Sequence, residues 1–579
     1  MNSHQSSPAL FRQILTDEWE HRMQEDPLFA TLCGDHRYDD RLPGLAEEDF
    51  ERRLGRMLEF HRRRTEIDRN ALPPAEQLNY DIFAEYLDRE IAEMQFRAYR
   101  MPISKIDGYH ALVPQMPQFI PLETSVDYEN YIARMRAFPR LADDLIDVMR
   151  AGLRGGQVPP RVTLDTVDDQ LRSQIVDEPA LSRLYKPFER FPKMIRKAEA
   201  DRLVAEGASA IMQAVVPGYR ALLKFFEEEY LPRARTGIAA TDLPDGGAFY
   251  AHRIRYHTTL ELSADAVHAA GLSEVDRIRE EMELVIRKVG FKGFFREFVE
   301  FLRIDSRFYA ALPETLLREA SYILKKIDGE LPRLFKTLPR MPYGLRQMPA
   351  EISAGNTTAR YWPPTGDGTR AGVFYVNTYD LKSRPLYELE ALSLHEAVPG
   401  HHLQLALQRE SGELPNFRRF GDFTAFVEGW ALYAERLGLE IGFYEDPYSD
   451  FGRLSFEMWR ACRLVVDTGM HSLGWTRQQA IDYLLEHTAQ TFLNIENEVD
   501  RYIGWPGQAL AYKTGEMKIR DLRRRAEEKL GQSFDLRDFH DAVLANGSVP
   551  LGILDKLVTE WIERQSPVVG KQGVNKQTA

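Results

Sequence analysis

The sequence predicts a mainly α-helical protein with one small β-sheet beside a helix that carries candidate metal ligands. From residue 10 to about 340, apolar residues recur at spacings of three and four, with only short Pro or Gly interruptions. Between residues 354 and 379, Gly, Thr and Pro become frequent, and residues 372–377 have the β-branched and aromatic composition of a strand. Helical spacing then resumes around the candidate ligands.

The chain length and the shortness of its Pro- and Gly-containing interruptions indicate one large body. A chain of 579 residues with 44% hydrophobic content can form two to four domains or a single large helical unit. Breakers such as Pro159-Pro160 are too short to act as flexible linkers. We therefore expect a single body over residues 1–579. In it, residues 10–350 form a helical wall, residues 351–565 hold the metal site and the substrate-binding half, and residues 566–579 form a frayed tail.

Composition also restricts compartment and partners. Cys33 and Cys462 are the two cysteines, and their separation argues against a disulfide framework, which favours a reducing compartment. The chain starts without a basic and apolar leader and has no run of eighteen apolar residues, so we expect a cytoplasmic protein that does not enter membranes. A net charge of −13 disfavours nucleic acid, and the basic run at residues 62–64 fits a solvated helix face.

One helix of the wall is well specified. Ser263-Ala-Asp265 is a start signal, and Val275, Ile278 and Met282 follow on one face of an amphipathic helix. The next informative segment is the strand at residues 372–377, which directly precedes the metal helix. Such a strand at a sheet edge can pair with extended substrate, and we place Asn377 among the substrate-binding residues. A buried structural hairpin is the alternative.

The chemistry is concentrated in residues 392–404. There His395-Glu396 is followed by Pro399-Gly400-His401-His402, where a zinc hydrolase helix usually has His-Glu-x-x-His. His401 would lie roughly 120° from His395 around an unbroken helix, but a proline at position 399 should bulge or break the helix there. We predict His395 and His401 as metal ligands and Glu396 as general base, with His402 as the alternate ligand.

A third ligand is expected from the apolar helix at residues 423–435. Its two acids, Glu428 and Glu435, are seven positions apart and share one face. A buried carboxylate is costly unless it is paired or bound to metal. We predict Glu428 as the third ligand and Glu435 as the residue that orients a ligand imidazole. Ion pairing to Arg436 or Arg460 is the alternative.

Two later segments supply candidate catalytic groups. Arg463, Asp467 and His471 follow helical spacing, and a salt-bridged stripe with a structural histidine is the ordinary explanation. The alternative that we carry forward is that His471, with Asp467 one turn away, is a neutral hydrogen-bond donor to substrate. In residues 498–515, Tyr502 or Tyr512 could donate its phenol to a developing oxyanion.

Basic side chains are candidates for holding a substrate carboxylate. Arg370 precedes the strand, and Arg501 and Lys513 flank the tyrosines. Guanidinium and ammonium groups bind carboxylates through charge-assisted hydrogen bonds. We expect these three residues to favour cleavage near a C-terminus.

With these motifs given, the chain resembles a bacterial family labelled as a domain of unknown function and thought to be zinc peptidases. The shared signature is His-Glu-x-x-Pro-Gly-His followed by Phe-x-Glu-Gly-Trp-Ala-Leu-Tyr-x-Glu, and the likeness extends to residues 32–42 and 506–512. That family is distantly similar to the helical clamshell peptidases of the thimet oligopeptidase, angiotensin-converting enzyme and Taq carboxypeptidase groups. The resemblance implies a large clamshell-like zincin fold of the gluzincin type, with His395, His401 and Glu428 as ligands and Glu396 as base.

We therefore expect a zinc-dependent hydrolase with one zinc per chain that cleaves short peptides. Hydrolysis of a non-peptide amide or ester at the same metal is one alternative, because the water chemistry is identical. A helical binding protein with a vestigial site is another, against which the intact ligand set argues.

Overall fold

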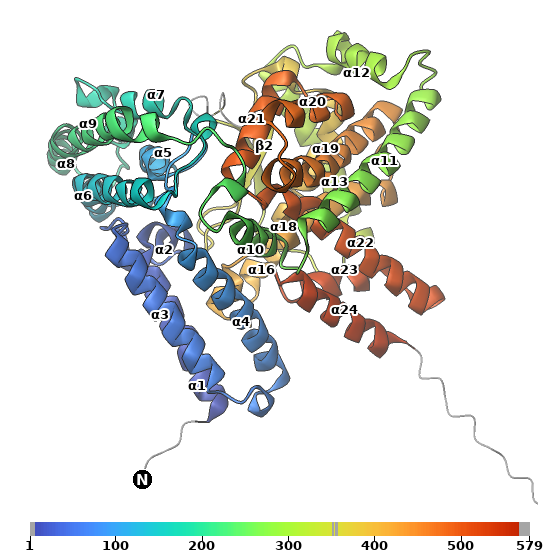
Figure 1. Ribbon diagram of the computed structural model, residues 1–579, viewed down its shortest axis with the longest axis horizontal. Coiled ribbons are helices and arrows are strands. Elements are labelled where there is room, and N and C mark those ends of the chain that lie inside the picture. Colours follow the sequence, from blue (N-terminus) through green and yellow to red (C-terminus); the bar gives the residue numbers. More distant parts are fainter. Residues whose placement is uncertain (1–5, 350–352, 354–356, 567–579) are drawn as a thin grey trace, which may run out of the picture.

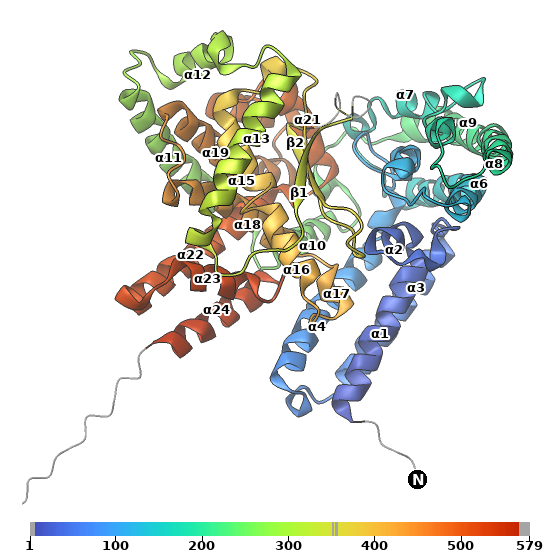
Figure 2. The same cartoon turned by 180° about the vertical axis from the view of Figure 1, so that it is seen from behind.

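Helices make up most of the computed structural model, which describes residues 6–349, 353 and 357–566. Figures 1 and 2 show two helical halves with a small sheet between them. The helices of the chain's first part are α1 (Ser7–Glu25), α2 (Pro27–Cys33), α3 (Glu47–Thr65), α4 (Pro74–Gln95), α5 (Tyr109–Leu112), α6 (Ser125–Gly155), α7 (Val167–Arg172), α8 (Lys197–Ala210), α9 (Val216–Phe225) and α10 (Gly246–Thr258). Helices α2 and α6 to α9 enclose an apolar core of their own.

The second half holds the remaining elements, and the larger apolar core extends from it to α1, α3 and α4 of the first part. Its helices are α11 (Ala264–Lys288), α12 (Phe295–Ile304), α13 (Pro313–Leu334), α15 (Leu389–Glu396), α16 (His401–Glu410), α17 (Asn416–Arg419), α18 (Thr424–Leu437), α19 (Pro447–Ser472), α20 (Arg477–His487), α21 (Phe492–Gly504), α22 (Ala511–Leu530), α23 (Leu536–Leu544) and α24 (Leu551–Gln565). The mainly helical fold class is therefore confirmed.

Helix α11 shows how the sequence pattern becomes structure. The Ser263 side chain caps its N-terminus by accepting a hydrogen bond from the Ala266 backbone, and Val275, Ile278 and Met282 are buried. This face packs against α19, in the half that contains the candidate site. Helices α11 to α13 thus pack with the elements that form the candidate site.

The sheet has the strand order β1-β3-β2. β1 (Tyr343–Gln347) runs parallel to β3 (Gly372–Val376), and β2 (Ala359–Trp362) runs antiparallel to it. The strand expected at residues 372–377 is therefore central, with both of its edges paired. The strand next to α15 is β2, and it corrects the expectation that β3 forms the edge at the metal helix.

Helices α18 and α22 cross at two glycines. A Cβ atom built on Gly429 would overlap Cα of Gly515, and one built on Gly515 would overlap the carbonyl oxygen of Ala425. Only glycine permits this approach of the two backbones. The crossing brings Glu428 of α18 close to the first turn of α22, which holds Tyr512.

Two expectations concern the chain ends and membranes. Apart from Ser566, the tail expected at residues 566–579 lies outside the described residues. Among the helices that the structure describes, none combines the length and apolarity that crossing a lipid bilayer requires.

Candidate metal and substrate site

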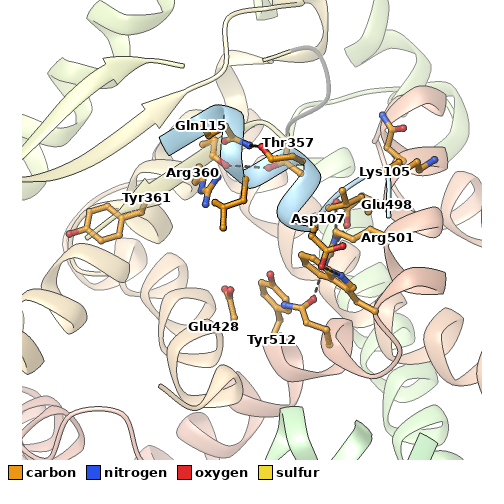
Figure 3. Close-up of a pocket in the computed structure, with 18 of the residues that line it drawn as sticks. Lys105, Asp107, Gln115, Thr357, Arg360, Tyr361, Glu428, Glu498, Arg501 and Tyr512 are labelled. Atoms are coloured by element: carbon orange, nitrogen blue, oxygen red, sulfur yellow. Dashed lines mark hydrogen bonds and ion pairs between the residues drawn. The ribbon is translucent and has the colours of Figure 1, made fainter. Parts of the chain in front are cut away.

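A cavity of about 1070 Å³ lies between the two halves of the molecule. Lys105, Tyr109 and Gln115 of the first half line one side of it. β2 and helices α15, α16, α18, α19, α21 and α22 line much of the rest. In Figure 3, Gln115 and Lys105 lie across the cavity from Glu428 and Tyr512. The volume is at the upper end of the range of small-molecule sites, roughly 300–1,000 Å³.

The helix that carries the histidines breaks at Pro399, as the sequence predicts. α15 ends at Glu396 and α16 begins at His401, and the Val398–Pro399 peptide between them is cis. A Cβ atom on Gly400 would overlap the carbonyl oxygen of His395, so the turn requires glycine. The break brings the two imidazoles together, with ring centroids 4.8 Å apart and planes at 86°.

His395, His401 and Glu428 form a compact group of donor atoms. Oε2 of Glu428 lies 3.8 Å from Nε2 of His395 and 3.5 Å from Nε2 of His401. Ligand atoms at about 2.0–2.2 Å from a tetrahedral zinc are roughly 3.4 Å apart, so the donor set and its spacing fit zinc. We call these three residues the ligand triad.

Glu435 is positioned to orient the first histidine. Nδ1 of His395 contacts Oε1 of Glu435 at 2.8 Å, which leaves Nε2 directed at the triad. Burial raises the pKa of Glu435 to about 8, and the Arg460 guanidinium, 3.6 Å away, opposes this shift. Burial also holds the pKa of His395 well below its usual value. The expected orienting role of Glu435 matches this contact, and the ion pair with Arg460 that was its alternative is also present.

Glu396 lines the cavity beside the triad and is only half-buried. Desolvation raises the pKa of this carboxyl above its usual value, opposed by His401 and assisted by the neighbouring Glu428. The backbone N–H of Tyr361 in β2 donates to it. A carboxylate with a raised pKa in a cavity is suited to accept a proton.

His402 faces away from the triad. Its Nδ1 lies 2.8 Å from the Tyr361 hydroxyl and its Nε2 lies 3.0 Å from the Met341 carbonyl oxygen. Burial lowers its pKa to about 4. Both ring nitrogens therefore have partners outside the triad, which leaves His401 as the second donor.

The two tyrosines occupy different environments. Tyr512 lines the cavity, with the Arg463 guanidinium 4.4 Å from its ring centroid. Tyr502 is fully buried, and its hydroxyl accepts hydrogen bonds from Trp459 Nε1 at 3.0 Å and from Arg463 Nε at 2.9 Å. Tyr502 is absent from the cavity lining, so the expectation of a catalytic phenol is retained for Tyr512 alone.

His471 is a packing residue and not a contact to the cavity. Its side chain is completely buried, its Nδ1 accepts from the Ala240 backbone at 2.9 Å, and its Nε2 contacts the Tyr502 carbonyl oxygen at 3.0 Å. Burial lowers its pKa to about 4. The neutral ring joins distant segments, which corrects the expected catalytic role.

Among the four expected substrate-binding residues, only Arg501 lines the cavity. Lys513 is completely buried and pairs with Glu274 and Glu457 at 2.8 Å and with Glu516 at 2.9 Å. These three carboxylates use up its donors, so Lys513 stabilises the core of the site half.

Arg370 and Asn377 also lie outside the cavity lining. Arg370 donates to the Pro363 carbonyl oxygen at 2.9 Å, within the loop between β2 and β3. Nδ2 of Asn377 donates to the carbonyl oxygens of Ser353 at 2.7 Å and Thr357 at 2.9 Å. Arg370 thus holds the loop between β2 and β3, and Asn377 holds the segment before β2, which corrects their expected contact with substrate.

Sequence reasoning missed several residues that line the cavity, notably Arg360 and Tyr109, and it named Arg460 only as a possible ion-pair partner. For α19, which carries Arg460, the sequence contains a pattern that could have indicated a site. This 26-residue helix is buried over its whole length from Phe451 to His471, yet it has a charged residue every three or four positions. Charged groups on such a helix need partners or a ligand. For Tyr109 and Arg360, no local pattern indicates that the fold brings them to one cavity.

Comparisons with known proteins agree with the fold. A solved structure described as a candidate lipoprotein from Colwellia psychrerythraea matches 96% of this chain and 100% of its own, with a TM-score of 0.91 and 29% identity. Another, described as a candidate lipoprotein of unknown function from Shewanella oneidensis, has the same coverage with a TM-score of 0.69 and 19% identity, which shows the fold alone. No match was found among curated proteins. The family described as bacterial protein of unknown function, DUF885, matches residues 27–558.

Proposed function

The chain belongs to DUF885, a bacterial family of unknown function, and from its site we propose that it is a zinc-dependent hydrolase of peptide bonds in short peptides. The observation that carries the proposal is the convergence of His395, His401 and Glu428, with the separate carboxylate of Glu396 beside them in a cavity. Three protein ligands with an open position describe a catalytic zinc rather than a structural one. A zincin-like clamshell is the corresponding fold assignment.

The ligand triad would hold one zinc ion per chain. When bound, this metal supplies Lewis acidity, which lowers the pKa of water and polarises a carbonyl group. Glu396 accepts the proton of the attacking water on its carboxylate oxygen and returns it to the leaving amine nitrogen. The Tyr512 hydroxyl donates a hydrogen bond to the oxyanion that forms on the substrate carbonyl.

β2 is suited to hold extended substrate. The Thr358 carbonyl oxygen accepts from the Asn377 backbone at 3.0 Å, so it faces β3. Because alternate residues of an antiparallel strand point their backbone groups in opposite directions, Ala359 presents its N–H to the open edge, while its carbonyl oxygen accepts from the Thr357 hydroxyl at 3.2 Å. Residues 357–361 line the cavity, where a peptide could add as a further strand.

The cavity walls favour short substrates. Helical segments of both halves line the cavity, which should admit extended chains and exclude folded proteins. We expect rates to fall once peptides exceed roughly a dozen or two residues, from a reach of about 3.3 Å per residue across a domain-sized cleft. Location in the cytoplasm and the absence of nucleic-acid partners stay predictions.

The test combines metal analysis with one variant. Purified protein should hold about one zinc per chain and should cleave an octapeptide faster than a long unfolded chain. The Glu396→Gln variant should keep its zinc and lose at least roughly 100-fold in turnover, because only the proton acceptor is removed. Normal turnover in that variant, or a protein without zinc after gentle purification, would refute the proposal.

A further inference from the structure

One corner of the cavity has two guanidinium groups for a single carboxylate. Oε2 of Glu498 accepts from Nη2 of Arg463 at 3.1 Å and from Nη2 of Arg501 at 2.8 Å. All three residues line the cavity. We call Arg463, Arg501 and Glu498 the arginine corner.

The arginine corner retains positive charge and an unused donor. Arg463 is only 3% exposed, its Nε donates to the Tyr502 hydroxyl, and its Nη1 has no hydrogen-bond partner among the described residues. Nη1 of Arg501 donates to the neutral amide of Gln508 at 2.6 Å. A buried guanidinium with a free N–H group is costly to maintain unless an anion arrives to complete its hydrogen bonds.

The charge of Arg463 also acts on Glu428 of the ligand triad, while two other carboxylates, on α19 and α21, have partners of their own. Asp467 accepts from the Tyr250 hydroxyl at 2.7 Å and from the Gly507 backbone at 3.1 Å, and burial raises its pKa to about 7. Asp500 pairs with Lys105 at 2.5 Å and with Arg477 at 2.6 Å. Neither side chain neutralises the second guanidinium.

The arginine corner is adjacent to the proposed reaction centre. The ring of Tyr512 lies over the Arg463 guanidinium, with 4.4 Å between the ring centroid and Cζ. In Figure 3, Tyr512 lies between Glu428 of the ligand triad and the pair formed by Arg501 and Glu498. A group bound at the corner would therefore be a short distance along a substrate from the bond at the triad.

We propose that the arginine corner binds a carboxylate of the peptide substrate, an inference that rests on the proposed peptidase function. Guanidinium groups recognise carboxylates through paired, charge-assisted hydrogen bonds, and the unused Nη1 of Arg463 would gain a partner. The carboxylate is supplied either by the free C-terminus or by an acidic side chain. The first source would make the protein cut near C-terminal ends.

Wild-type kinetics test this inference without any variant. An octapeptide with a free C-terminus should be cleaved with a kcat/KM about 10- to 100-fold above that of its C-terminal amide, because a hydrogen bond to a charged group contributes roughly 1.5–3 kcal/mol. A third octapeptide, a C-terminal amide whose last residue is Glu, tests the second source. If its kcat/KM equals that of the free acid, the bound carboxylate is that of an acidic side chain. Equal rates for all three peptides overturn the inference but leave the hydrolase proposal standing, whereas cleavage of none refutes the hydrolase.

A binding measurement separates the subsite from turnover. Calorimetry with zinc-loaded protein should show glycyl-phenylalanine binding at least about tenfold more tightly than its amide. The Arg501→Gln variant should reduce this ratio toward one, and Arg524→Gln, an exposed arginine of α22, should preserve it. Circular dichroism checks that both variants fold. Equal affinity of acid and amide for the wild-type protein would overturn the inference.

Discussion

Replacing Glu435 by Gln tests how strongly this residue controls the proposed metal ligand His395. The substitution preserves size and keeps an oxygen that can accept from Nδ1 of His395, 2.8 Å away. It removes the negative charge that this carboxyl carries above its pKa of about 8, a charge that faces the imidazole and the Arg460 guanidinium, so the comparison is made at pH 9. The change is therefore electrostatic and creates no cavity.

The expected magnitude follows from this one contact. A hydrogen bond to a charged group contributes roughly 1.5–3 kcal/mol and a neutral one roughly 0.5–1.5 kcal/mol. The difference of about 1.4 kcal/mol corresponds to a tenfold weaker zinc affinity. Glu435→Ala, which leaves Nδ1 of His395 without its acceptor, should approach a 100-fold loss, the upper end for residues that support metal ligands.

The assay is the zinc dissociation constant, measured by competition with a chromophoric chelator on each folded variant. Glu440 is a matched control because it follows the same helix and pairs with Arg523 at 2.7 Å at the surface. Glu440→Gln should bind zinc as the wild-type protein does. If Glu435→Gln binds zinc no more weakly than this control, the orienting role is wrong.

Three further predictions concern metal, pH and the core. His401→Ala should lose zinc, whereas His402→Ala should keep it and lose roughly 1–3 kcal/mol of unfolding free energy in urea titrations, because two partners become unpaired. Burial lowers the pKa of His471 to about 4 and of His540 to about 3. Below about pH 6.5 the unfolded chain therefore binds more protons than the folded chain. The unfolding free energy should fall by roughly 1.4 kcal/mol per pH unit for each of these histidines as the pH is lowered toward 4. In the His540→Asn variant this fall should be less steep. Lys513→Met should cost about 3–5 kcal/mol in the same titration by leaving buried carboxylates unpaired, and an unchanged midpoint would contradict the ion-pair network.

The helical fold and the ligand triad could be predicted because their determinants are local in sequence. Helical periodicity marks each amphipathic face, and the interruption at Pro399 and Gly400 is visible in the chain itself. The triad spans only residues 395–428, and one sequence motif with one following helix supplies all of it. Local rules are sufficient for such a site.

The roles of His471 and Lys513 could not be predicted because their partners are distant in sequence. His471 accepts from the backbone of Ala240, 231 positions away, and Lys513 pairs with Glu274 of α11. The sequence pattern of a charged or imidazole side chain on a buried helix face is the same whether that side chain contacts a substrate or another helix, so the pattern does not distinguish the two roles. The order of the strands was also beyond the sequence, since β1 lies outside the segment whose composition indicated a strand.

The crossing of α18 and α22 makes the spacing of the reactive groups a property of the main chain. Glu428 immediately precedes Gly429, and Tyr512 lies three positions before Gly515, so both groups are anchored within one turn of the point where the backbones touch. A single methyl group at Gly429 would push the helices apart and change the separation of carboxylate and phenol together. Such a protein would keep every proposed reactive side chain, but the Glu428 carboxylate and the Tyr512 phenol would no longer be at the distance that the native backbone sets.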